Sequence, residues 1–338
     1  MDTNTFSYNL IQNQNHTPFF ILGRERSGTT MLRIALNGHS KIYIPPESTF
    51  ILNLLNKHKN KLNTSKLISD LKLDPYLKAW VINYDELLVD LNSITTPTYQ
   101  AFCWTILGHM NKKAKLLGDK NPTYALFGKK IIELYPDAKI IWLIRDYRSQ
   151  VNSMLKVNFE KKDVASLTVR WAVYNQHIHQ LELDIPNQVL RIRYEDLVES
   201  SEASYTKICS FLGLKYEDTM LSWNKKNEEF HSAHHQSLSE KPTTKHIAEW
   251  KKELSIKQVR ICQTIAGVYG EQLGYQKIDV ASYPVFIMLF KSILYGRAYI
   301  PFIKLMYALP FSWRKALQKR VIEPNSKFWK EINQELEN

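Results

Sequence analysis

The sequence is poor in cysteine, with only Cys103, Cys209 and Cys262 among its 338 residues. An odd number of widely separated cysteines, without a Cys-x-x-Cys spacing, predicts neither a disulfide framework nor a zinc site. We therefore expect three reduced thiols packed in the core. The sequence also lacks an internal repeat, a low-complexity tract and a glycine–serine linker, so no domain boundary is evident before residue 279.

The sequence also shows no pattern typical of a targeting segment or of a membrane-spanning helix. Residues 1–16 have neither the basic flank nor the apolar run of a signal peptide, which favours a cytoplasmic protein. The most apolar stretch, residues 285–309, contains three cations and Pro301. It therefore does not supply the ~18 uncharged residues that a transmembrane helix needs.

Acidic residues are fewer than basic ones, with 33 Asp and Glu against 45 Lys and Arg and a net charge of +12. This excess predicts attraction for an anion, whether nucleotide, nucleic acid or lipid headgroup, without choosing among them. Hydrophobic residues make up 44% and charged residues 23%, which excludes a disordered chain. Residues 280–322 contain no acid at all but seven cations: Lys291, Arg297, Lys304, Arg314, Lys315, Lys319 and Arg320.

This acid-free tail predicts two helices broken near Pro301, each apolar on one side and basic on the other. Such helices suit peripheral contact with a membrane, or with a lipid-like acceptor, through residues 280–322. A helical hairpin packed on the body of the protein is the alternative. We accordingly divide the chain into a main domain, residues 1–279, and a C-terminal basic amphipathic helical extension, residues 280–338.

Short apolar runs alternate with stretches of helical length along the main domain. The runs that predict buried strands are residues 18–23, 138–144 and 189–192. The helical stretches are residues 31–36, 83–91, 122–135 and 163–183. This alternation favours an α/β fold with a central parallel sheet flanked by helices, in three layers. Ligands of such sheets bind at the carboxyl ends of the strands.

The first strand leads into a phosphate loop, residues 23–30, which reads GRERSGTT and has the Gly-x4-Gly spacing of a P-loop. Its glycines let backbone N–H groups face one concavity, and the following helix adds its positive end. Thr29, however, stands where a Walker loop has its lysine, and residues 139–144 lead into Arg145 rather than a magnesium-binding acid. The loop therefore provides poorly for ATP with magnesium. Arg26 instead offers a fixed cation to a phosphate group.

At this loop the sequence resembles the sulfotransferases that use 3′-phosphoadenylyl sulfate (PAPS), in the Arg-Ser-Gly-Thr-Thr form shared by tyrosylprotein sulfotransferases and many bacterial enzymes. The resemblance implies PAPS as cofactor, PAP as product and no required metal. It assigns cofactor binding to the loop residues Arg26, Ser27, Gly28, Thr29 and Thr30. A second match is Arg145 with Ser153 eight residues later, which implies a 3′-phosphate site; a strand-end arginine and a serine on the next helix can converge on one phosphate.

Two further matches imply catalytic residues. Glu47, in Pro-Pro-Glu-Ser-Thr, lies 21 positions after Arg26, where the tyrosylprotein type has its catalytic glutamate, a general base. Lys120, in Asp-Lys-Asn-Pro, matches the lysine that stabilises the transferring group, a role that Arg26 would share. A turn or cap residue at 47 and an ordinary surface lysine at 120 are the alternatives. His39 and His109 are alternative bases.

Weaker matches concern the nucleotide. Tyr194, in Arg-Tyr-Glu-Asp-Leu, resembles a family tyrosine that lies against adenine, and Lys245 resembles a late basic residue at the 3′-phosphate, without the family's glycines around it. Met31 stands where the small-molecule branch has a stacking tryptophan. Three histidines in the sequence HSAHH have a metal-like spacing but no carboxylate or cysteine beside them, so we expect a solvated loop there: His231, His234 and His235.

The leading hypothesis is therefore a PAPS-dependent sulfotransferase that acts on a hydroxylated small molecule. The apolar basic tail favours a sterol or lipid acceptor; a carbohydrate or a peptide tyrosine is the alternative. An ATP-dependent kinase of the P-loop group is a rival that a magnesium requirement would reveal. A non-enzymatic basic module that binds membrane or nucleic acid is a third hypothesis, although we expect no nucleic-acid partner for the enzyme.

Overall fold

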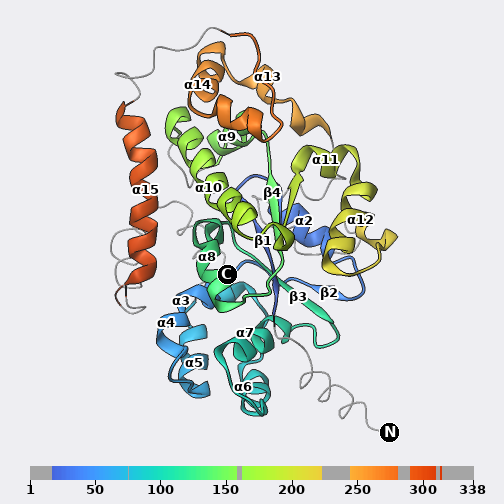
Figure 1. Ribbon diagram of the computed structural model, residues 1–338. Helices are drawn as coiled ribbons and strands as arrows, with labels where there is room; N and C mark the ends of the chain where they lie inside the picture. The colour runs from blue at the N-terminus through green and yellow to red at the C-terminus, as the bar shows by residue number, and fades with distance from the viewer. Residues whose placement is uncertain are drawn as a thin grey trace, which may run out of the picture. The chain divides into compact units, whose positions relative to one another are not determined.

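Figure 1 shows the protein as a computed structural model, which describes residues 17–74, 76–157, 162–222, 244–280, 290–309 and 313. The chain divides into two compact units. The first comprises Met1–Arg24, Gly28–Ile144 and His177–Thr243, and the second Glu25–Ser27, Arg145–Gln176 and Thr244–Asn338. All five strands of the described chain lie in the first unit.

The first unit is built on a parallel sheet with the strand order β2-β3-β1-β4-β5. Its strands are β1 (Phe19–Leu22), β2 (Ile42–Tyr43), β3 (Leu116–Lys120), β4 (Ile140–Ile144) and β5 (Val189–Arg193). Every residue of β1 and β4 is buried, as expected for strands covered on both faces. The predicted α/β fold with a central parallel sheet is thus confirmed, and its three predicted strands are β1, β4 and β5.

Strand β3 was not predicted, because its sequence Leu-Leu-Gly-Asp-Lys has few residues that favour strands. Pairing with β1 forms it, and the register places Gly118 beside Phe19. A Cβ atom at Gly118 would lie 2.6 Å from the Phe19 ring, so any other residue there would force this buried ring to shift. Gly118 therefore lowers the strand preference of this segment, and the pairing of β3 with β1 nevertheless depends on it.

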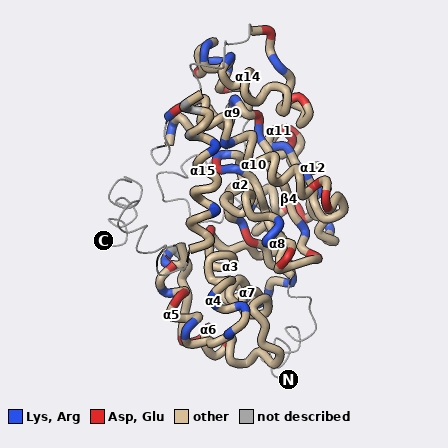
Figure 2. Tube along the Cα trace, turned by 60° about the vertical axis from the view of Figure 1, so that its left-hand side comes forward, with Lys and Arg blue, Asp and Glu red and all other residues tan. Residues whose placement is uncertain are grey.

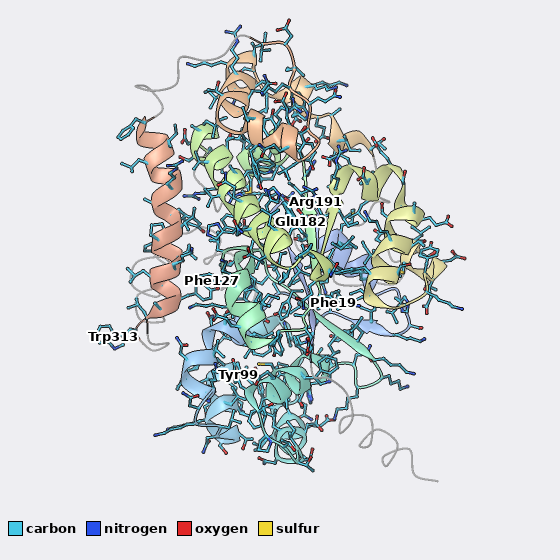
Figure 3. All side chains as sticks on the ribbon, viewed as in Figure 1. Phe19, Tyr99, Phe127, Glu182, Arg191 and Trp313 are labelled. Carbon is cyan, nitrogen blue, oxygen red and sulfur yellow. The ribbon has the colours of Figure 1, made fainter. Side chains whose placement is uncertain are left out.

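Helices cover both faces of this sheet. Figure 1 shows α2 (Thr29–Leu36), α11 (Tyr194–Glu199) and α12 (Ser201–Leu212) on one side and α8 (Gly128–Leu134) on the other. On the α8 side, Phe20 packs against Tyr135, with ring centroids 5.8 Å apart. Arg191 of β5 pairs with Glu182 at 3.5 Å (Figure 3).

Shorter helices follow β2; all of them lie between strands except the last, which comes after α12. Their bounds are α3 (Phe50–Asn53), α4 (Leu55–His58), α5 (Thr64–Leu71), η1 (Tyr76–Ala79), α6 (Tyr84–Asn92), α7 (Tyr99–Gly108), η2 (Pro122–Phe127), η3 (Pro186–Gln188) and η4 (Asp218–Leu221). The helices predicted at residues 31–36 and 83–91 are α2 and α6. The stretch predicted at 122–135 divides into the 3₁₀ turn η2 and the helix α8, because Asn121 caps a tight turn that begins at Pro122.

The regular secondary structure described in the second unit is all helical. Its helices are α9 (Tyr147–Leu155), the first part of α10 (Val164–Asp184), η8 (Thr244–Ile247), α13 (Trp250–Glu253), α14 (Ile256–Gln272) and α15 (Phe290–Ala308). Trp171 is fully buried, with its ring 5.5 Å from that of Tyr147 and 5.8 Å from that of Tyr269. The Trp171 indole also donates a hydrogen bond to the Arg145 carbonyl over 2.9 Å.

The predicted break at Pro301 is wrong, since α15 continues through that residue. A proline removes one N–H donor, and the remaining turns of a 19-residue helix keep theirs. No helix in the described part of the chain is long and apolar enough to span a bilayer. The three cysteines are free and buried, as predicted. The histidines at 231, 234 and 235 lie outside the described residues, and the domain boundary at 279 stays a prediction.

Candidate active site

Glu47 and Lys120 contact each other in the first unit. Lys120 is the last residue of β3, at the carboxyl end of the sheet, and Glu47 lies between β2 and α3. The Lys120 Nζ donates to Glu47 Oε1, and also to Thr30 Oγ1 over 3.1 Å. The Lys120 side chain is 1% exposed and that of Glu47 is 36% exposed, so Lys120 is not a surface lysine. The fold thus brings together three residues that the sequence singled out separately.

Burial lowers the pKa of the Lys120 ammonium, and the Arg33 cation acts in the same direction, while Glu47 opposes both. Arg33 lies on α2 with 6% of its surface exposed, and it donates to the Ile44 carbonyl over 3.4 Å. Sequence reasoning missed Arg33. Its spacing of three residues from Thr30 places both on one face of α2 and was the available signal.

Hydrogen bonds fix the segment that carries Glu47. The Asn121 amide donates to the Ser48 carbonyl over 2.6 Å, and its oxygen caps η2 by accepting from the Thr123 N–H over 2.8 Å. Asn37 exchanges two hydrogen bonds with Ile44, of 2.7 and 2.8 Å. Sequence reasoning missed Asn121 as well, although asparagine before proline indicates a cap.

Asp119 precedes Lys120 in β3 and points to the opposite face of the sheet. Its register partner in β1 is Phe20, whose ring packs against Tyr124 and Tyr135. The carboxyl is fully buried, and burial raises its pKa to about 7. Near neutral pH this group is therefore partly neutral, which limits the negative charge it adds behind Lys120.

The N-terminus of α2 begins at Gly28, which has a φ of 94° and gives the helix no side-chain cap. A Cβ atom at Gly28 would lie 2.6 Å from the Tyr194 ring. Gly28 is thus needed both for its positive φ and for this close approach. Tyr194 is buried and lies against Gly28; its contact with adenine stays a prediction. Thr29, which follows Gly28, is 4% exposed.

Arg26, Arg145 and Ser153 form a second group of predicted residues, in the second unit. Arg26 has a φ of 65°, uncommon for a residue with a side chain, and its Nε donates to Ser153 Oγ over 3.0 Å. Arg145 donates to the Arg26 carbonyl over 3.1 Å and to the His246 carbonyl over 2.7 Å. Lys245 lies next to His246 in η8, and its side chain is outside the described residues.

Helix α9 supports this second group. The Gln150 amide donates to the Glu25 carbonyl over 2.8 Å, and the Ser149 hydroxyl donates to the Ile247 carbonyl over 2.8 Å. Ser27, the third loop residue in this unit, is 1% exposed. Sequence reasoning missed Gln150 and Ser149, which lie one turn before Ser153. Their position on the same helix as Ser153 was the only signal for them.

The two histidines considered as alternative bases bond to other groups. His39 is 3% exposed, and its Nε2 lies 3.0 Å from the Lys215 carbonyl oxygen. His109 Nδ1 lies 3.1 Å from the Asp90 carboxylate. Within the described ranges, no group of three or more His, Cys, Asp or Glu residues is arranged to hold a metal ion.

The sequence that forms this site matches a known family. A model of the Sulfotransferase family matches residues 18–218, more than half of the chain, so the protein belongs to the sulfotransferase family. The match begins one residue before β1 and ends where η4 begins. It therefore covers the phosphate loop, Glu47, Lys120 and the Arg145–Ser153 pair.

Individual relatives support this assignment. The chain is 27% identical to the protein-tyrosine sulfotransferase of Drosophila melanogaster over 66% of its own length and 41% of the relative's. It is 23% identical to the omega-hydroxy-beta-dihydromenaquinone-9 sulfotransferase of Mycobacterium bovis, over 58% of this chain and 63% of that one. The sulfotransferase domain from the curacin biosynthetic pathway shares the fold, with a TM-score of 0.52 and 23% identity over 78% of this chain and 99% of that one.

Proposed function

We propose that this protein transfers a sulfuryl group from PAPS to a hydroxyl group of an acceptor. The contact between Glu47 and Lys120, beside Thr30, carries this proposal. A hydroxyl that binds at this pair meets a carboxylate that takes its proton and an ammonium that stabilises negative charge. The acceptor oxygen then forms a bond to sulfur while the bond from sulfur to the phosphate oxygen of PAPS breaks. The products are a sulfate ester, PAP and protonated Glu47.

Two groups of residues fit the anionic parts of PAPS. In the first unit, Gly28 is the N-cap of α2 and provides no side-chain hydrogen bond to the helix. The N–H groups at this end of α2 therefore suit a phosphate or phosphosulfate. In the second unit, Arg26, Arg145 and Ser153 place guanidinium and hydroxyl donors together. Arginine and hydroxyl donors are the usual partners of a phosphate monoester such as the 3′-phosphate.

For the acceptor, we propose an apolar hydroxylated small molecule such as a lipid or sterol. The acid-free tail and a relative named for a menaquinone substrate support this choice. Relatives named for protein tyrosine support a peptide acceptor as the alternative, and carbohydrate is a third. A cytoplasmic location remains part of the proposal. The chain spans 41% and 52% of the protein-tyrosine sulfotransferases from Drosophila melanogaster and Caenorhabditis elegans.

Calorimetry with PAP and AMP tests the cofactor assignment. Arg145 and Ser153 would bond only to the 3′-phosphate, and hydrogen bonds to charged groups contribute about 1.5–3 kcal/mol. We therefore expect PAP to bind at least about tenfold more tightly than AMP. Equal affinities would contradict the assignment. A requirement for magnesium and ATP, without sulfate transfer from PAPS, would favour the kinase hypothesis.

An acceptor panel tests the second half of the proposal. Sulfate transfer from PAPS is measured with sterols, hydroxylated lipids, phenols, sugars and a tyrosine peptide, each with and without EDTA. We expect transfer to the apolar hydroxyl compounds, unaffected by EDTA. Transfer only to sugars or to the peptide would reject the apolar acceptor and leave the sulfotransferase assignment standing.

A further inference from the structure

Helix α15 has one face that packs against its own unit. Gly296 is buried, and a Cβ atom there would lie 3.0 Å from the Cβ of Val169 on α10. The Arg170 guanidinium lies 3.8 Å from the centroid of the Tyr299 ring. Ile300 and Met306 are 8% and 5% exposed. This inner face is therefore already covered, and it holds α15 in place.

The opposite face of α15 is apolar and exposed. Phe290, Leu294, Phe302 and Leu305 have 61, 56, 43 and 59% of their surfaces exposed. With 100° between successive residues, Phe290, Leu294 and Leu305 fall within one stripe about 60° wide, and Phe302 extends it. Trp313, just beyond the C-terminal end of α15, is 69% exposed (Figure 3). We call this stripe the outer face of α15.

Positive charge borders the outer face. Arg297 and Lys304 are both exposed and lie seven residues apart, so they follow the same edge of the stripe. α15 contains Lys and Arg but no Asp or Glu (Figure 2), and the acid-free stretch extends from residue 280 to 322. An apolar stripe edged by cations alone is complementary to a surface that is apolar inside and anionic outside.

We propose that the outer face of α15 binds the surface of an anionic lipid bilayer, with the helix lying in the plane of the interface. Phe302 and Leu305 would enter the apolar region, while Arg297 and Lys304 would contact the anionic headgroups. A second copy of the chain fits less well, because a symmetric contact would bring the same cations against each other. This inference concerns α15 alone and does not depend on the proposed reaction.

Co-sedimentation of the full chain with vesicles tests the proposal. Vesicles of phosphatidylcholine alone are compared with vesicles that also contain phosphatidylglycerol. We expect binding to the mixed vesicles, weaker binding to the neutral ones, and a loss of binding as salt rises. Failure to bind the mixed vesicles at low salt would overturn the proposal.

Paired variants locate the binding face. Phe302→Ser with Leu305→Ser should reduce partitioning into mixed vesicles about tenfold or more. The matched control is Val268→Ser with Val89→Ser, which alters two apolar residues, 67 and 64% exposed, on α14 and α6. Equal losses in both pairs would reject α15 as the binding face. Light scattering shows whether the α15 variants instead disrupt a dimer, which would assign the face to a second copy.

Charge variants and a label complete the test. Arg297→Glu with Lys304→Glu should lower binding to mixed vesicles about tenfold or more and leave the weak binding to neutral vesicles unchanged. Lys251→Glu with Lys252→Glu is the control. Because the three native cysteines are buried, Ala298→Cys, an exposed position within the stripe, accepts a polarity-sensitive fluorophore and leaves the four large apolar residues in place. A blue shift with mixed vesicles at position 298, but not in Val268→Cys, supports the proposal; no shift at 298 contradicts it.

Discussion

The two groups of site residues are built in different ways. Lys120 ends a buried strand, is 1% exposed and contacts Glu47 and Thr30. Arg26 and Ser153 belong instead to a loop with positive φ and to a helix that follows a strand, and both are half-buried. The first group thus has a scaffold of parallel strands, whereas the second depends on side chains that bond to carbonyl and hydroxyl oxygens.

The difference between the two groups indicates different roles, the first in the reaction and the second in cofactor binding. A buried ammonium with a lowered pKa, next to a carboxylate, suits charge that develops during a reaction. Guanidinium and hydroxyl groups, half-buried in Arg26 and Ser153 and buried in Arg145, suit the recognition of a stable phosphate. We therefore expect changes in the first group to lower turnover and changes in the second to lower cofactor affinity.

The largest effect is expected from Glu47→Gln. The variant removes the proposed base and keeps the size of the side chain, so turnover should fall roughly 10²–10⁴-fold while PAP affinity stays within about twofold. Steady-state kinetics and calorimetry measure the two effects. Glu86→Gln is the control, because Glu86 also pairs with a lysine, Lys112 at 2.9 Å, on an exposed surface. Normal turnover in Glu47→Gln, together with an inactive His39→Ala or His109→Ala, would show that the base is misassigned.

The next largest effect concerns Asp119 and stability. Its pKa is about 7 in the folded chain, against about 3.9 for an ordinary aspartate, so the folded chain binds this proton more tightly. The group's stabilising contribution is therefore complete below about pH 4 and is lost as the pH rises through about 7, by up to about 4 kcal/mol. Asp119→Asn should remove that loss. In urea unfolding, the free energy of unfolding of the variant should therefore rise relative to that of the unaltered chain between about pH 5 and about pH 8.

Asp85→Asn is the control for this measurement, because Asp85 is exposed at the start of α6. It should leave the pH dependence of unfolding as in the unaltered chain. An Asp119→Asn variant with the same pH dependence as the unaltered chain would show that Asp119 is ionised throughout this range.

A smaller effect is expected from Asn121→Ala. The variant loses the hydrogen bond to the Ser48 carbonyl, so the segment that carries Glu47 loses part of its support. Turnover should fall about tenfold to a hundredfold, with little change in PAP affinity, because misplacement of a catalytic group is costly. Asn83→Ala removes the N-cap of α6 and controls for the loss of a cap. Equal turnover in the two variants would assign Asn121 a purely structural role.

The smallest effect is expected in the second group. Ser153→Ala removes one donor to the 3′-phosphate and should weaken PAP about tenfold while AMP binding stays the same. Calorimetry with both nucleotides measures this, and Ser69→Ala, which loses a hydroxyl on α5, is the control. If Ser153→Ala instead lowers turnover at saturating PAPS and leaves PAP affinity unchanged, the assignment of the second group to cofactor affinity is wrong.

Much of the fold follows from local pattern. The apolar runs at 18–23, 138–144 and 189–192 became β1, β4 and β5, because short apolar runs between helices favour buried parallel strands. The phosphate loop was evident from Gly23 and Gly28 and from its place between strand and helix. Lys120 and Glu47 were found through family resemblance, since 73 residues separate them and no local pattern joins them.

Local sequence pattern was enough to predict β1, β4, β5 and the phosphate loop, because these depend on neighbours within a few residues. That Leu-Leu-Gly-Asp-Lys forms β3 depends on tertiary contacts, since Gly118 accommodates Phe19 from another strand. The continuation of α15 through Pro301 was likewise not evident from local pattern, and the inner face of this helix packs against Val169 of α10 at Gly296. The meeting of Lys120, Glu47 and Thr30 has the same origin: contacts between distant residues depend on sheet register and helix packing, which local preferences do not encode.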